Sequence, residues 1–236
     1  EALSENEQDE MPGWMQTTQV AKGKEHLLLS NDEEHLLFYV EKGGVEFRAS
    51  NIRKKSINTP DYIVIKIDSD SEFDKVVNVA ITGNEILTGL ALPSFVVTDG
   101  LSGLLIYIPL DGKGDFETCR SAAEYLCKLV RLKIPELVML QGDGNHSYGK
   151  VSLDFTFNEA GKYIVSPYSL LRDHLTVATP LSWDEVNDEL RPEAFNHETI
   201  FKRLKTVDDP FKTLFKKKVN VDALYERLTS NYSFLF

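Results

Sequence analysis

The stretch of sequence that decides the fold is DYIVIKIDSD, residues 61–70. Apolar residues crowd its first half, and Asp68 and Asp70 come at its end. This pattern predicts a buried β-strand that presents carboxylates where it leaves the sheet. A second strand is expected at VSLDFTF, residues 151–157, with Asp154 inside it.

If these two strands are neighbours, Asp68, Asp70 and Asp154 could share Mg²⁺ or Mn²⁺, which favour oxygen ligands. A two-metal site of this kind aligns the attacking and leaving oxygens in phosphoryl transfer. Acidic residues at strand ends are also often solvated or cap loops, and a D-x-D pattern arises easily by chance. Spacing alone therefore favours the structural interpretation and leaves the metal site open as the alternative.

Strands and helices interleave along the rest of the chain without a regular alternation. Further strands are expected at 26–30, 35–40, 45–50, 93–100, 104–110 and 162–168, the last in a hairpin with 151–157. Helices are expected at 76–90 and 116–133, and a third begins at Trp183, where Ser182 and Glu185 form a capping box. This order predicts an α+β (mixed α/β) fold.

A glycine-bearing loop at 98–103 joins two of these strands. Its backbone N–H groups could wrap a phosphate, with Ser102 and Gly103 as the nucleotide-binding candidates. Asp99 would repel such an anion, and an ordinary turn is the plainer interpretation. The basic run at 216–218 could also touch phosphate, although a solvated helix face explains it as well.

The composition argues against tight DNA binding, a membrane span and a disulfide. Lys and Arg number 26 against 37 Asp and Glu, a net charge of −11, which argues against tight DNA binding by this chain alone. No apolar run approaches the roughly 20 residues that cross a bilayer, so no membrane span is expected. Cys119 and Cys127 lie on one predicted helix, about 12 Å apart along its axis, too far for a disulfide. Two free thiols suit a reducing cytoplasm.

Several segments together resemble the polymerase domain of bacterial non-homologous end-joining ligase D, a member of the archaeo-eukaryotic primase superfamily. The most specific is VSPYSLLRDHLTVATPLSWDEV at 165–186, followed by RPEAF at 191–195 and PFKTLF at 210–215. The segments DYIVIKIDS (61–69), PSFVVTDGLSGLLIYIPL (93–110) and GKVSLDFTFN (149–158) look like the family's motifs I, II and III. PGWMQTTQV (12–20) and GGVEFRAS (43–50) are similar to its N-terminal part.

The resemblance implies a primase-like core, with a central, mainly antiparallel sheet flanked by helices. Such a domain would span residues 13–215, after a disordered acidic lead-in at 1–12 and before a C-terminal helical tail at 216–236. The portion that precedes Pro12 in the family is expected to be missing, which leaves recognition of a 5′-phosphate open.

Most departures from the family pattern fall on residues that the resemblance assigns to metal or nucleotide binding. In motif I the first metal-binding aspartate falls on Lys66, while the second is kept as Asp68, and motif III keeps Asp154. No arginine stands at 146–148, where a basic residue is expected. The lysine, serine and histidine of motif II fall on Val97, Asp99 and Leu105. The arginine of Y-S-x-R falls on Leu171, and Arg172 could replace it as a nucleotide-binding residue if the strand slips by one position.

Each replacement has a physical cost. Lysine in place of aspartate changes the local charge by two units, and at an effective dielectric of about 20 a cation about 4 Å from Mg²⁺ is repelled by several kcal/mol. Asp99 adds negative charge where a triphosphate would sit. Asp70 could replace the missing carboxylate if the strand continues regularly past Asp68.

The sequence therefore favours a degenerate primase-polymerase domain in DNA repair, one that acts as a nucleic-acid or protein binding module. The alternative is an active Mn²⁺-dependent nucleotidyltransferase that fills in ends at double-strand breaks with Asp68, Asp70 and Asp154. Mn²⁺ or Mg²⁺ is the cofactor if the chain is an enzyme, and none is needed otherwise. The partners that the family implies are DNA ends and end-joining proteins such as a ligase or Ku. A purely protein–protein role would suit the acidic charge, and the oligomeric state is left open.

Overall fold

The computed structural model describes residues 12–20, 25–70, 72–144 and 149–235. The acidic lead-in predicted at 1–12 lies outside these ranges except for residue 12. The segment 146–148, where the resemblance calls for a basic residue, lies wholly outside them.

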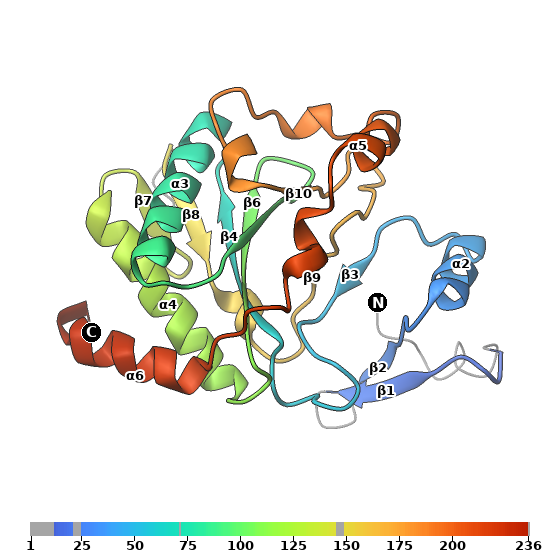
Figure 1. Ribbon diagram of the computed structural model, residues 1–236, viewed down its shortest axis with the longest axis horizontal. Helices are drawn as coiled ribbons and strands as arrows, with labels where there is room; N and C mark the ends of the chain where they lie inside the picture. The colour runs from blue at the N-terminus through green and yellow to red at the C-terminus, as the bar shows by residue number, and fades with distance from the viewer. Residues whose placement is uncertain (1–11, 21–24, 71, 145–148, 236) are drawn as a thin grey trace.

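The strands of the central six-stranded sheet follow the order β10-β5-β6-β4-β8-β7. The sheet runs through the middle of the domain (Figure 1). Its strands are β4 (Tyr62–Asp68), β5 (Phe95–Thr98), β6 (Leu104–Pro109), β7 (Val138–Leu140), β8 (Val151–Asp154) and β10 (Pro180–Leu181). All neighbouring pairs are antiparallel except β7 and β8, which run parallel. The predictions of an α+β fold and of a mainly antiparallel central sheet are confirmed.

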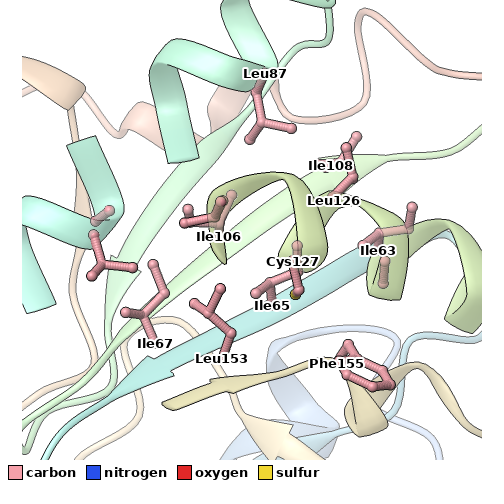
Figure 2. Packing of buried hydrophobic residues seen from close by; sticks show 14 of the residues in the cluster. Ile63, Ile65, Ile67, Leu87, Ile106, Ile108, Leu126, Cys127, Leu153 and Phe155 are labelled. Atoms are coloured by element: carbon pink, nitrogen blue, oxygen red, sulfur yellow. The ribbon is translucent and has the colours of Figure 1, made fainter. Parts of the chain in front are cut away.

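The first face of the sheet carries the main hydrophobic core. Ile63, Ile65 and Ile67 of β4 point to this face, since side chains alternate along a strand (Figure 2). They pack in one cluster with apolar residues of three helices. These helices are α3 (Phe73–Gly89), α4 (Phe116–Lys133) and α6 (Val221–Asn231). The ring of Tyr225 on α6 lies 5.9 Å from that of Tyr125 on α4, so the C-terminal helix belongs to this core.

The second face of the sheet carries a smaller core. Val64 of β4 joins Val97, Leu105 and Tyr107 of the neighbouring strands, and the C-terminal half of the chain adds Ile164, Leu171, Ala178 and Leu214. One end of this face therefore packs against loops, while the other end holds the polar residues of β4.

The remaining elements are short. Two small sheets pair β1 (Thr17–Val20) with β2 (Glu25–Leu28) and β3 (Arg48–Ala49) with β9 (Ile164–Val165). The remaining α-helices are α2 (Glu33–Glu41) and α5 (Ile200–Thr206). Single 3-10 turns occur at η2 (Thr156–Asn158), η3 (Trp183–Glu185), η4 (Pro192–Ala194), η5 (Pro210–Thr213) and η6 (Ser233–Leu235).

Several predictions of local structure were wrong. The run at 35–40, predicted as a strand, is part of helix α2, because Asp32 caps the helix by accepting a hydrogen bond from the backbone N–H of His35 at 3.1 Å. The predicted hairpin of 162–168 with 151–157 does not form. Strand β8 ends at Asp154 in a 3-10 turn, and β9 pairs with β3 instead. The capping box at Ser182 and Glu185 is present, but the helix after it is only the single turn η3.

Candidate functional site

The polar end of the second face is formed by β4 and its two neighbours. In the strand register, Lys66 lies opposite Leu105 of β6 and opposite Asp154 of β8, and Asp68 lies opposite Ser152. Residues directly opposite one another share a face of the sheet, so Lys66, Asp68 and Asp154 all lie on the second face. The condition set for a shared site, that the two aspartate-bearing strands are neighbours, is met, since β4 pairs with β8.

Lys66 forms ion pairs with two acidic residues of this face. Its Nζ lies 2.6 Å from Oδ2 of Asp68 and 3.3 Å from Oδ2 of Asp99. Burial alone would lower the pKa of Lys66, but the hydrogen bond to Asp68 and the charge of Asp99 outweigh it, and the pKa is raised. The ammonium group therefore stays charged and lies between the two carboxylates.

Asp99 closes its own loop. Its Oδ1 accepts hydrogen bonds from the backbone N–H groups of Leu101, at 2.8 Å, and Gly103, at 2.9 Å. A Cβ atom at Gly103 would lie 2.5 Å from Oδ2 of Asp99, so the loop needs glycine at this position. The N–H groups predicted to cradle a phosphate are thus already bound to a carboxylate of the chain itself.

The two predicted nucleotide-binding residues of this loop have internal partners. The hydroxyl of Ser102 donates a hydrogen bond to Oδ1 of Asp68 at 3.0 Å. Gly103 donates its N–H to Asp99, as described above. Lys66, Asp68, Asp99 and Ser102 together form a connected set, which we call the internal ion pair cluster.

Asp154 lies opposite Lys66 in the strand register and forms a turn with Thr156. Its Oδ1 accepts hydrogen bonds from both the N–H and the hydroxyl of Thr156, each at 2.7 Å. Sequence reasoning missed Thr156, and only its position two residues after an aspartate, which suits such a turn, could have indicated it. Asp154 therefore serves as a structural cap in this arrangement.

Asp70 lies beyond the end of β4. Strand β4 ends at Asp68, so the regular alternation needed to bring Asp70 onto the same face stops two residues before it. The side chain of Asp70 is exposed. Within the described ranges, no group of three or more His, Cys, Asp or Glu side chains is arranged to hold a metal ion.

Apolar side chains occupy the other positions where the motifs call for polar groups. Val97 and Leu105 are fully buried, and Leu171 is 7% exposed, all within the second core. Leu171 packs on the loop at Gly100, where a Cβ atom would overlap its side chain. Arg172, by contrast, is exposed, so the chain at 171–172 turns its leucine to the core and its arginine to solvent.

An open groove of about 740 Å³ lies beside the Asp99 loop. The residues that line it carry hydroxyl, imidazole, amide and carboxylate groups besides apolar surface; they are Gly100, Leu101, Ser102, His174, Leu175, Thr176, Glu193, Asn196, His197 and Glu198. Among these described residues there is no lysine or arginine, the usual partners of a triphosphate. Glu193 and Glu198 make the groove a poor fit for an anionic ligand.

The fold and the retained aspartates on one sheet face define a domain of the primase-polymerase class. The chain matches the family described as "LigD, primase-polymerase domain" over residues 2–211, and it belongs to that family. It is 28% identical over 218 residues to the bifunctional non-homologous end joining protein LigD of Bacillus subtilis, covering 91% of this chain and 35% of that protein.

A second relative and a solved structure are also similar to this chain. The chain is 36% identical over 113 residues to the multifunctional non-homologous end joining protein LigD of Mycolicibacterium smegmatis, covering 47% of this chain and 15% of that protein. The solved polymerase domain from Mycobacterium tuberculosis ligase D in complex with DNA has the same fold, with a TM-score of 0.80 at 22% identity over 92% of this chain and 79% of that one. The chain thus spans about a third or less of the length of these LigD proteins. Among the described residues, no helix is long and apolar enough to cross a membrane.

Proposed function

We propose that this chain is a non-catalytic primase-polymerase domain that binds DNA ends in non-homologous end joining. Relatives named as end-joining proteins and a relative solved with DNA support the role. The observation that carries the non-catalytic part is the placement of Lys66 Nζ at 2.6 Å from Asp68 and 3.3 Å from Asp99.

The residues of the site do not fit a pair of divalent ions. An ion that approached Asp68 would meet the ammonium of Lys66, and at an effective dielectric of about 20 the repulsion at about 4 Å amounts to several kcal/mol. Displacing Lys66 would leave Asp99, which is 5% exposed, without its counter-charge. Mn²⁺ or Mg²⁺ therefore has no part in the function proposed.

The residues do not fit a nucleotide triphosphate either. Asp99 holds the backbone N–H groups of the loop, and the buried Val97 and Leu105 offer no hydrogen bonds. A triphosphate needs cations and hydrogen-bond donors, whereas the Lys66 ammonium is already paired and the rest of this face offers carboxylates and apolar surface. Cytoplasmic location and a ligase or Ku as protein partners belong to the same proposal.

The test is primer extension on a gapped, 5′-phosphorylated DNA with Mn²⁺ and nucleotides. The wild type, Asp154→Ala and the surface control Asp188→Ala are compared, each with a thermal melt to establish folding. We expect no incorporation by any of the three. Incorporation by the wild type and Asp188→Ala that is lost in Asp154→Ala would overturn the non-catalytic assignment.

A second measurement tests the DNA-binding part. Fluorescence anisotropy with a labelled duplex end should show binding by the folded wild type at low salt, and the binding should weaken as salt rises. No binding at the lowest salt would contradict this part and favour a purely protein–protein role.

A further inference from the structure

Two basic runs that are far apart in the sequence come together at the ring of Phe215. Arg53, Lys54 and Lys55 form the first run, and Lys216, Lys217 and Lys218 form the second; all six side chains are exposed, and we call them the basic patch. Phe215 joins the runs. The guanidinium carbon of Arg53 lies 4.8 Å from the centroid of the Phe215 ring, and Nζ of Lys218 lies 5.7 Å from it.

The first run is held in place by neighbouring segments. Nε of Arg53 lies 2.5 Å from Oδ2 of Asp61, just before β4, and Nζ of Lys54 donates a hydrogen bond to the side chain of Gln16 at 3.1 Å. A cation over an aromatic ring adds roughly 0.5–1 kcal/mol at an exposed site. These contacts fix the direction of Arg53, so part of the entropy cost of binding is met before a ligand arrives.

The second run is held between two anchors. The ring of Phe211 lies 5.4 Å from that of Tyr107, and Leu214 is buried in the second core. At the other end, the N–H of Val219 donates to the carbonyl of Pro109 at 2.9 Å. The lysines precede α6 and are not part of a helix, so the interpretation of this run as a solvated helix face was wrong.

The charge of the patch differs from that of the chain. Six basic side chains gather on a protein whose net charge is −11, and the one acidic group that contacts them among the described residues, Asp61, has a side chain only 13% exposed. The second run also lies beyond the residues matched by the family, which end at 211. A cluster of this kind raises the local concentration of anionic ligands at this surface, and the attraction weakens as salt rises.

We infer that the basic patch is the surface that holds the phosphate backbone of DNA. A repeating phosphate array suits a row of lysines beside a guanidinium of fixed direction, because the guanidinium can donate two parallel hydrogen bonds to one phosphate. This inference rests on the proposed DNA binding and names the part of the chain that performs it. The Asp99 loop and its groove take no part.

The experiment measures binding of a labelled blunt duplex to the full chain across a series of salt concentrations. Lys216→Ala/Lys217→Ala is compared with the wild type and with Lys202→Ala/Lys205→Ala, which removes two exposed lysines of α5 and so changes the net charge equally. We expect the patch variant to bind more weakly and to lower the slope of log K against log salt by about two, one for each lost phosphate contact. The α5 variant should keep the slope of the wild type.

A third variant, Phe215→Leu, tests the ring without changing the charge. It should weaken binding less than the double lysine variant while leaving the melting transition cooperative. If the wild type binds DNA and both double variants bind as it does, the patch inference is overturned while the proposed DNA binding stands. An equal loss in both double variants would also overturn it, because net charge alone would explain the effect.

Two further outcomes separate the alternatives. If the wild type binds no DNA, the proposed function fails together with the inference. If an acidic peptide such as poly-glutamate displaces the duplex at equal charge concentration, the patch is a protein-docking surface and the inference is overturned. Failure of poly-glutamate to compete is the result that we expect.

Discussion

The two faces of the central sheet differ in kind although they share every strand. The first face of β4 is uniformly apolar, with Ile63, Ile65 and Ile67 covered by helices (Figure 2). The second face runs from the buried Val64 to the charged Lys66 and Asp68. The hydrophobic core of the first face can hold the fold together on its own, because its packing does not involve the side chains of the second face. The second face could therefore exchange polar groups for apolar ones and an aspartate for a lysine.

The largest effect is expected on the first face. Leu126→Ala removes a side chain of α4 that is 2% exposed and leaves a cavity, so the free energy of unfolding should fall by about 3 kcal/mol. Urea denaturation measures this loss. Leu132→Ala on the same helix removes a side chain that is 56% exposed and should change stability by less than about 0.5 kcal/mol. Equal effects of the two changes would show that α4 does not pack as described.

A smaller loss is expected at the apolar part of the second face. Leu105→His places a polar ring at a fully buried position, so stability should fall by about 2 kcal/mol without any gain in nucleotide binding. Denaturation and a nucleotide-binding titration measure the two quantities. A stable variant that binds nucleotide would mean that the second face is still a working site.

A substitution in the internal ion pair cluster should lower the free energy of unfolding by as much as Leu105→His or by less. The size of this loss should depend on pH. Lys66→Met leaves Asp68 and Asp99 without a counter-charge; because Lys66 and Asp68 are partly exposed, we expect about 2 kcal/mol or less at neutral pH. The raised pKa of Lys66 means that its stabilising effect is complete below about 10.5, its ordinary value, and fades as the pH rises through the higher folded value.

Denaturation midpoints of the wild type and Lys66→Met at several pH values test this dependence. The difference in stability between them should be constant near neutral pH and shrink above about 10.5. Lys202→Met, a change at an exposed lysine, should show no such trend. A difference that grows at alkaline pH would contradict the assigned role of Lys66.

The smallest effect is expected for the hydroxyl of Ser102. Ser102→Ala removes an exposed hydrogen bond to Asp68 and should cost about 0.5 kcal/mol. A double-mutant cycle with Asp68→Ala sharpens the measurement, since the serine change should have no further effect once Asp68 is gone. An unchanged cost in that background would mean that the hydroxyl acts elsewhere.

Sequence patterns predicted four of the six strands of the central sheet, β4, β5, β6 and β8, and they predicted α4 from its helical period. They gave no strand at the short β7 and β10. They failed at 35–40, where a capping aspartate decided between helix and strand, and after Asp154, where one side-chain turn redirected the chain. The site was predicted in part. The motifs located Lys66, Asp99 and Leu105, but their pairing depends on strand register and loop closure. The meeting of residues 53–55 with 216–218 at Phe215 has no local signal at all.

Binding of Mn²⁺ tests the central claim most directly, namely that Lys66 takes the place of a metal ion on the second face. Titration of the folded wild type, followed by the electron paramagnetic resonance signal of free Mn²⁺, should show no stoichiometric site. Lys66→Asp, which would set three carboxylates on one sheet face, should gain a site and serves as the positive control. A single site in the wild type that disappears in Asp154→Ala would contradict the account.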